Sequence, residues 1–237
     1  MSAYDINIAQ LKNIALALDD LLSEVTFVGG CTTALLVDAS AFFGVRQTDD
    51  VDVIVDVTTY VEYQHFSEQL RERGFIEDVE GPTCRWLWCD DLGVIRLDVM
   101  PINEAALGFS NRWYPEAIEN SISVELDTDI EISVVAPVYF LATKFEAFIG
   151  RGNGDYFSHD LEDIVFVLEN RSNILREVLD APSDVKEYLA DKAAELLNDD
   201  FLNVLPGILN NADSASETEN MLGIIARSAL NPKPYLN

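Results

Sequence analysis

The clearest pattern in the chain is the alternation of Asp50, Asp52 and Asp56 with valines in DVDVIVDV, residues 50–57. Successive side chains of a strand point to opposite faces, so this segment is predicted to be a strand with one acidic and one apolar face. Apolar residues at three-and-four spacing predict helices instead. The predicted strands cover residues 25–28, 50–57, 83–88, 94–99, 122–126 and 130–134, and the predicted helices cover residues 8–22, 31–41, 61–73, 138–151 and 159–170.

The second half of the chain has a different pattern, because its periodic segments are helical. Residues 174–209 are predicted to be helical with a break at Pro206–Gly207, and the polar residues 210–219 are predicted to be a mobile connector. A change of composition near Val135 separates the two halves. We therefore expect an α/β (α+β) core, a mixed β-sheet flanked by helices, over residues 1–135, and a helical C-terminal region over residues 136–237.

Charge restricts the function more than length does. The 237 residues include 15 Lys and Arg against 42 Asp and Glu, for a formal net charge of −27, and 49% of them are hydrophobic. Such a chain is globular, but it repels polyanions, so any contact with nucleic acid needs a local basic patch or bridging cations. No apolar run approaches the roughly 18–20 residues of a membrane span, and the N-terminus lacks a secretory pattern. The expected location is cytoplasmic, without a membrane partner.

Two acids of the alternating strand carry the candidate chemistry. Asp50 and Asp52 project from the same face, where two carboxylates repel each other unless a cation lies between them. Asp98, in the predicted strand VIRLDVM, would bring a third carboxylate from a neighbouring strand. Mg²⁺ prefers such oxygen ligands. Asp49 and Asp56 are placed outside this group, on the opposite face and further along the strand.

Gly29 and Gly30 follow a predicted strand and precede a predicted helix. Bare backbone amides and the positive end of a helix suit a phosphate group. Further contacts to that phosphate are predicted from the hydroxyl groups of Thr32 and Thr33 and from the guanidinium of Arg46. For Arg46, an ion pair with Asp49 is an equally good interpretation.

The segments FVGG, TDDVDV and IRLDV together resemble the signature of the nucleotidyltransferase (polymerase-beta-like) superfamily. That signature is a Gly-Gly or Gly-Ser turn, a strand with Asp-x-Asp and a later strand with a third acid; here Cys31 stands where serine is common. The resemblance implies the nucleotidyltransferase fold, a nucleoside triphosphate (NTP) as substrate and one or two Mg²⁺ ions as cofactor. It also implies that Asp50, Asp52 and Asp98 are the metal ligands and catalytic residues.

Residues 135–168 resemble the segment that follows the catalytic sheet in AbiEii-like nucleotidyltransferases, a group of toxins and phage-defence proteins. In that group a helix carries a Lys and an Arg, and the next helix opens with two acids one turn apart, which correspond here to Lys144, Arg151, Asp160 and Asp163. The resemblance implies that Lys144 binds the nucleotide and that Asp160 is catalytic or orienting, so the helical region is expected to contribute Lys and Asp side chains to the catalytic cleft. Since Lys144 and Arg151 are seven residues apart on one predicted helix, both are expected to reach phosphate.

The leading hypothesis is an Mg²⁺-dependent transferase that moves a nucleoside monophosphate from an NTP to an acceptor hydroxyl of a tRNA or a protein. The resemblance adds the role of toxin in a toxin-antitoxin or abortive-infection system, with a cognate antitoxin as partner. A first alternative is a small-molecule transferase of the aminoglycoside-modifying kind, which the negative charge favours because its acceptor is polycationic. A second alternative is a non-catalytic nucleotide-binding module.

Overall fold

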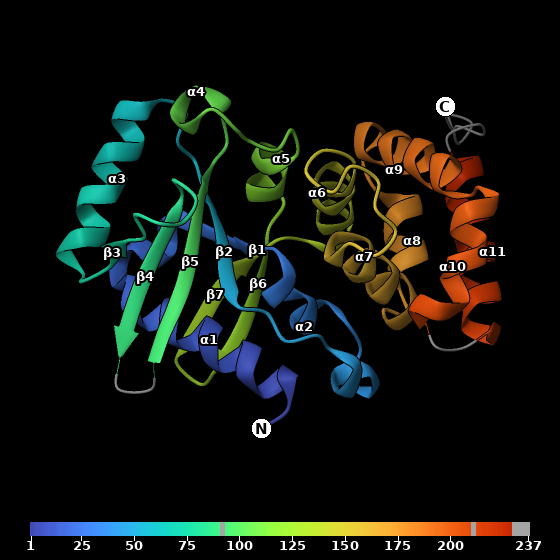
Figure 1. Cartoon of the computed structure of the whole chain (residues 1–237), viewed down its shortest axis with the longest axis horizontal. Coiled ribbons are helices and arrows are strands. Elements are labelled where there is room, and N and C mark those ends of the chain that lie inside the picture. Colours follow the sequence, from blue (N-terminus) through green and yellow to red (C-terminus); the bar gives the residue numbers. More distant parts are fainter. Residues whose placement is uncertain (91–92, 210–211, 229–237) are drawn as a thin grey trace, which may run out of the picture. The chain divides into compact units, whose positions relative to one another are not determined.

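A computed structural model describes residues 1–90, 93–209 and 212–228 of the chain (Figure 1). The chain divides into two compact units, Met1–Ala136 and Pro137–Asn237, and each is described by itself. Among the described residues, no helix has both the length and the apolar character needed to cross a membrane.

Seven strands in the described part of the first unit form one mixed sheet in the order β3-β4-β5-β2-β1-β7-β6 (Figure 1). The pairs β2–β5 and β1–β7 are parallel, and the other neighbours are antiparallel. This sheet and its helices confirm the predicted fold class. The strands are β1 (Val25–Val28), β2 (Asp50–Val55), β3 (Ile76–Glu77), β4 (Arg85–Asp90), β5 (Gly93–Pro101), β6 (Ile122–Asp127) and β7 (Ile130–Val134). The strands predicted over 83–88 and 94–99 leave residues 89–93 as a predicted turn, of which residues 91–92 lie outside the described residues.

The alternating segment 50–57 begins as the predicted strand, β2, at the centre of the sheet. Val51 and Val53 are fully buried, whereas Asp50 and Asp52 on the other face are half-buried. The alternation ends at Ile54, which lies on the acidic face and is also fully buried. The acidic face is therefore open only at the start of β2, and this places the two aspartates at its accessible end.

Helix α1 (Ala3–Leu18) packs against β2, β5 and β7, and it buries Leu11, Ile14 and Leu18. It begins five residues before the helix predicted over 8–22, because the side chain of Ser2 and that of Asp5 form a capping box at its N-terminus. Residues 19–22 belong instead to a 3₁₀ turn, Asp19–Glu24. The remaining helices of this unit are α2 (Thr33–Leu36), α3 (Tyr60–Glu72), α4 (Glu104–Leu107) and α5 (Tyr114–Glu119).

The helix predicted over residues 31–41 was wrong in length. Only α2, one turn long, is α-helical, and a 3₁₀ turn precedes it at Gly30–Thr32. The chain is extended at Val37, and a second 3₁₀ turn follows at Ala39–Gly44, with no buried residue and with Phe43 95% exposed. A helix here would have no apolar face to pack, and packing supplies most of the stability of a helix in a protein.

The second unit is built of helices: α6 (Pro137–Ile149), α7 (His159–Asn170), α8 (Ile174–Asp180), α9 (Ser183–Leu196), α10 (Asp199–Leu209) and α11 (Ala212–Ser228). Helix α6 packs against α7, α8 and α9, and α11 contacts the helices from α7 to α10.

Two predictions for this unit were wrong. Pro206 does not break α10, because Phe201 and Leu205 hold this helix in the core at 0% and 1% exposure. Residues 210–211 of the predicted mobile connector lie outside the described residues, and residues 212–219 begin α11. The buried residues of α11 recur at helical spacing, at Ala215, Thr218, Leu222 and Ile225.

Candidate active site

Three aspartates and one arginine meet on one face of the sheet, and we call Asp50, Asp52, Asp98 and Arg85 the acidic cluster. In the parallel pair β2–β5, Asp52 lies opposite Asp98, and in the antiparallel pair β4–β5, Arg85 lies opposite Asp98. Paired residues of neighbouring strands share a face. The sheet register therefore brings together the three predicted acids and adds a cation to them.

Arg85 binds two of the three carboxylates. Its Nε donates to Oδ1 of Asp98 at 2.7 Å and its Nη2 donates to Oδ2 of the same residue at 2.8 Å, a bidentate pair. The same Nη2 lies 2.9 Å from Oδ2 of Asp50. The hydrogen bond to Asp98 raises the pKa of Arg85 further above its ordinary value, so the guanidinium is a permanent charge within the cluster.

The glycine turn lies directly against Asp52. Val28, the last residue of β1, pairs with Asp52, and Gly29 follows with φ at +74°. A methyl group on Gly29 would overlap the carboxylate of Asp52. Both the left-handed backbone and the close approach of Asp52 therefore require glycine at position 29.

Three of the predicted phosphate-binding residues, Gly30, Thr32 and Thr33, lie in or directly after that turn. Gly30 opens a 3₁₀ turn, and Oγ1 of Thr32 donates to the carbonyl of Gly29 at 2.8 Å. Thr33 is 3% exposed, and its Oγ1 has no hydrogen-bond partner among the described residues. A buried hydroxyl without a partner carries a desolvation cost that a bound acceptor, such as a phosphate oxygen, would remove.

The acidic cluster has the ligand chemistry of a Mg²⁺ site but not the arrangement of one. Carboxylate oxygens are the ligands that Mg²⁺ prefers. Among the described residues, however, no group of three or more His, Cys, Asp or Glu side chains is placed to hold a metal ion. Arg85 occupies both oxygens of Asp98 and one of Asp50. A divalent cation therefore does not fit this arrangement of the cluster.

Asn7 of α1 holds the segment that leads into β2, and the sequence analysis did not identify it. This side chain is fully buried. Its Nδ2 donates to the carbonyl of Arg46 at 2.8 Å, and its Oδ1 accepts from the backbone N–H of Thr48 at 3.1 Å. Asn7 thereby fixes the chain two residues before Asp50. Its signal in the sequence was a polar residue on the apolar side of the first helix, but the predicted helix began at residue 8 and so left Asn7 out.

We expect Asn7→Ala to destabilise the first unit by about 1–3 kcal/mol, because it leaves a buried carbonyl and a buried N–H without partners. Asn7→Asp keeps an acceptor for Thr48 but buries a charge and sets an oxygen against the carbonyl of Arg46, so it is expected to lose at least as much stability as Asn7→Ala. Urea unfolding measures both variants. Equal stability of all three proteins would contradict the role of this residue.

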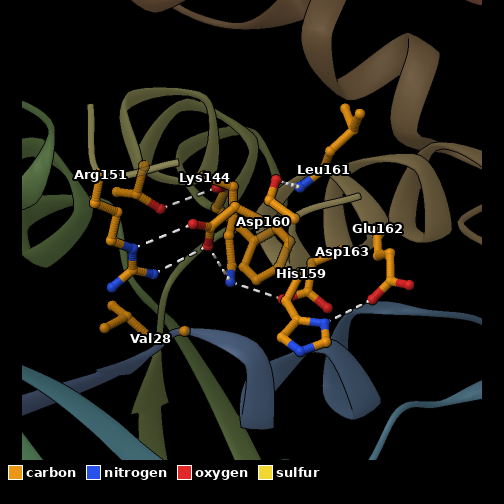
Figure 2. Close-up of polar contacts among 12 residues, drawn as sticks. Val28, Lys144, Arg151, His159, Asp160, Leu161, Glu162 and Asp163 are labelled. Atoms are coloured by element: carbon orange, nitrogen blue, oxygen red, sulfur yellow. Dashed lines mark hydrogen bonds and ion pairs between the residues drawn. The ribbon is translucent and has the colours of Figure 1, made fainter. Parts of the chain in front are cut away.

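In the second unit, two basic and two acidic side chains form a mostly buried group, which we call the lysine cluster (Figure 2). Nζ of Lys144 on α6 lies 3.0 Å from Oδ1 of Asp160 and 2.7 Å from Oδ2 of Asp163, both on α7. Arg151 donates to both oxygens of Asp160, at 3.2 and 3.0 Å. The structure therefore brings together the four residues that the family resemblance singled out in this segment.

Burial and charge act in opposite directions on this cluster. Burial alone would lower the pKa of Lys144, but the carboxylates of Asp163 and Asp160 outweigh it and raise the pKa. Burial alone would raise the pKa of Asp160, but Lys144 and Arg151 outweigh it and lower the pKa. Lys144 and Asp160 therefore stay ionised although both are buried.

Arg151 does not share a helix with Lys144, contrary to the prediction. Helix α6 ends at Ile149, and Arg151 lies in the turn that follows, which leads to Asn153 and Gly154 with positive φ. The side chain of Arg151 is 73% exposed, whereas that of Lys144 is 8% exposed. Arg151 is therefore largely exposed to solvent while it pairs with Asp160, whereas Lys144 is buried between its two carboxylates.

No protein-family model matches the chain, and no curated protein matches it. A solved structure of an antigenic nucleotidyltransferase-like protein from Paracoccidioides brasiliensis is similar, with a TM-score of 0.55 at 14% identity over 92% of this chain and 93% of that one. The chain has a nucleotidyltransferase-like fold.

Within this nucleotidyltransferase-like fold, the predicted site residues lie in two places. The acidic cluster and the glycine turn belong to the first unit, and the lysine cluster belongs to the second. The expectation that both contribute to one cleft stays a prediction.

Arg85 is the residue of the acidic cluster that sequence reasoning missed. The predicted turn over residues 89–93 would pair Trp88 with Val94. In that register Arg85 would lie opposite Leu97. The observed register pairs Asp90 with Gly93 and therefore places Arg85 opposite Asp98. A shift of one residue in the pairing moves a side chain to the other face of the sheet. Whether Arg85 joins the acidic cluster therefore depends on the pairing register of β4 and β5, which the predicted turn had wrong by one residue.

Proposed function

We propose that the chain is a nucleotidyltransferase that moves a nucleoside monophosphate from an NTP to an acceptor hydroxyl. A bond forms between the acceptor oxygen and the α-phosphorus, the bond from that phosphorus to the bridging oxygen breaks, and pyrophosphate leaves. The acceptor proton passes to a carboxylate of the acidic cluster. The observation that carries this proposal is the contact of the Gly29 turn with Asp52, with Asp98 in register beside it.

The residues have distinct proposed roles. The turn at Gly29 and Gly30, with the unpartnered hydroxyl of Thr33, would hold phosphate oxygens. The carboxylates of the acidic cluster would bind and orient the reacting groups, with Mg²⁺ as the proposed cofactor. Lys144 and Arg151 would balance the charge of the triphosphate, and Asp160 would orient Lys144 through their ion pair.

The proposed acceptor is a tRNA or a protein, and the proposed biological role is that of a toxin with a cognate antitoxin. This part of the proposal depends on the resemblance of residues 135–168 to the AbiEii-like group. The net charge of −27 supports a second candidate, transfer to a polycationic small molecule of the aminoglycoside kind. A labelled NTP incubated with tRNA, with the protein itself and with aminoglycosides distinguishes these acceptors.

Thermal unfolding with each of the four NTPs, with and without Mg²⁺, tests the site. One NTP at about a hundredfold excess over its Kd is expected to stabilise the protein by about 2.7 kcal/mol. We expect the double variant Asp50→Asn/Asp52→Asn to lose this stabilisation by NTP. The stabilisation of each variant is measured against the unfolding temperature of the same variant without nucleotide. The control is Asp49→Asn/Asp56→Asn, which removes the same charge from exposed residues that flank the pair. Stabilisation that is equal in both variants would refute the assignment, and no stabilisation in the wild type would favour a non-catalytic module.

A further inference from the structure

The outer edge of the sheet at β6 carries a surface that the proposed function does not use. We infer that it is a docking site for an extended segment of a protein partner, in which basic and apolar residues alternate. The segment adds a strand to the sheet beside β6. We call Ile122–Asp127, together with the groove beside these residues, the β6 edge. No step of this docking depends on nucleotidyl transfer.

β6 is the longer of the two outermost strands. It has six residues and only β7 as a neighbour among the described strands, whereas β3 at the other end of the strand order has two residues (Figure 1). An outermost strand leaves about half of its backbone N–H and C=O groups without a partner in the sheet. An extended peptide can pair with these groups, and such main-chain hydrogen bonds supply the affinity when a strand is added to a sheet.

The side chains of β6 specify which segment fits. Half-buried apolar residues alternate with exposed polar ones in the order Ile122, Ser123, Val124, Glu125, Leu126 and Asp127. An added strand places its own side chains on the same two faces, beside those of β6. Apolar residues of the partner would cover the exposed part of Ile122 and Val124, and polar residues would lie beside Ser123 and Glu125. The partner segment therefore needs the same alternation.

A repulsive pair on the polar face of the β6 edge selects for basic residues. Glu125 of β6 pairs directly with Glu131 of β7, and both residues are exposed. Like charges that lie opposite each other on neighbouring strands destabilise the pairing. A lysine or arginine on an added strand would lie beside Glu125 and relieve this repulsion.

The groove beside the strand extends the negative charge. It has a volume of about 690 Å³, and among the described residues that line it are Asp19, Asp20 and Glu131 but no Lys or Arg. Asp20 already forms an ion pair with Arg73. A second groove of about 360 Å³ shares three serines with the first and adds two more acids, Glu24 and Asp56. Several cationic side chains of one segment would therefore find carboxylates and hydroxyl acceptors here.

These charges disfavour a second copy of the chain at the same place. Pairing of two β6 edges would bring the acids of both copies together, in a chain whose net charge is −27. A β-bulge between Glu125 and Asp127 also interrupts the strand, and bulges and charges commonly prevent self-pairing of edge strands. The same acids attract a basic segment, so the edge discriminates between the two occupants.

Fluorescence anisotropy with a capped hexapeptide that alternates lysine and valine tests the docking. The control peptide has the same composition, but its lysines precede its valines. In an extended strand the control spreads its lysines over both faces. We expect the alternating peptide to bind the wild type and the control peptide to bind about tenfold more weakly, because fewer of its lysines reach the acids.

A third peptide tests strand pairing itself. It keeps the alternating sequence but is methylated at every backbone nitrogen, so it has the same charge and no N–H to donate. We expect it to lose binding. In addition, the alternating peptide should slow hydrogen exchange of the amides in residues 122–127 and leave those of α3, residues 60–72, unchanged. Equal binding of the methylated and unmethylated peptides would show that charge alone holds them, and would overturn the inference.

Glu125→Lys tests the place of docking. We expect this variant to bind the alternating peptide about tenfold more weakly, because an attractive cross-strand pair becomes a repulsive one. The control is Glu68→Lys, which makes the same change of charge at an exposed residue of α3 and should bind like the wild type. Circular dichroism checks that both variants fold; if Glu125→Lys does not, Glu125→Gln replaces it and should still bind more weakly than the wild type.

Three further results would overturn the inference. The wild type binds no peptide, it binds the alternating and the grouped peptide equally tightly, or the Glu125 variants bind as tightly as the wild type. A dimer of the protein alone that the alternating peptide dissociates, seen by analytical ultracentrifugation, would assign the β6 edge to a second copy and would overturn it as well. Because no peptide experiment contains an NTP, each of these results leaves the proposed nucleotidyl transfer untouched.

Discussion

Lys144→Met is expected to destabilise the protein by about 3–5 kcal/mol, the usual cost of removing one partner from a buried ion pair. Methionine preserves most of the volume of the lysine but removes the charge that faces Asp160 and Asp163. Asp160 would keep only Arg151, which is largely exposed and therefore a weaker counter-ion. Urea unfolding followed by circular dichroism measures the loss.

The control for this prediction is Lys192→Met. Lys192 lies 2.7 Å from Glu195, but the side chain of Glu195 is 62% exposed, so this pair resembles a surface salt bridge. Its removal is expected to cost about 0–1 kcal/mol. Equal losses of stability in the two variants would show that the ion pairs of Lys144 contribute no more than a surface salt bridge.

The effect of Lys144→Met should depend on pH. In the wild type, the pKa of Asp160 lies below its ordinary value of 3.8, so its stabilising effect is present above that pH and is lost as the pH falls below it. In the variant, the buried carboxylate of Asp160 loses the buried cation that keeps it ionised, and uptake of a proton relieves the cost of burying its charge. The difference in stability between the two proteins should therefore narrow as the pH falls toward 3.8.

Gly29→Ala is the second change with a large expected effect. Its φ of +74° would cost a residue with a side chain about 1–3 kcal/mol. The added methyl group would also overlap the carboxylate of Asp52, and forcing atoms into a filled space typically costs about 1–3 kcal/mol more. We expect the variant to lose stability in urea unfolding and to lose the stabilisation by NTP, because Asp52 must move.

Gly108→Ala separates these two causes. Gly108 has a φ of +82°, but a methyl group there would meet no atom within 4 Å. It should therefore show the backbone cost alone and should leave the response to NTP intact. If Gly29→Ala is no more destabilising than Gly108→Ala, the overlap of the added methyl group with Asp52 does not destabilise the protein.

The sequence was most informative where one pattern served both structure and chemistry. The alternation of residues 50–57 predicted the strand, its two faces and the shared face of Asp50 and Asp52. Their closeness to Asp98 depended on strand order, which a periodic pattern does not contain. The sequence offered a neighbouring strand only as one way to bring Asp98 to the pair, and the parallel pairing of β2 and β5 shows that this strand is adjacent.

The sequence was least informative where tertiary contacts decide. Arg85 depended on one residue of hairpin register, and Asn7 depended on a contact with a loop 39 residues away. In the second unit, the polar composition of residues 212–219 concealed a helix whose few apolar positions are buried by α7, α8 and α9. The helix and strand propensities of a segment contain no information about contact partners that lie so far along the chain.

The position of β1 has a consequence for synthesis of the protein. This strand lies between β2 and β7, and the hydroxyls of Thr26 and Ser133, 3.2 Å apart, are separated by 107 residues along the chain. One edge of β1 therefore stays unpaired until the ribosome has made β7, and such an open edge is a template for pairing with another chain. Pro137 begins α6 directly after β7, so every strand of the sheet is made before the first helix of the second unit.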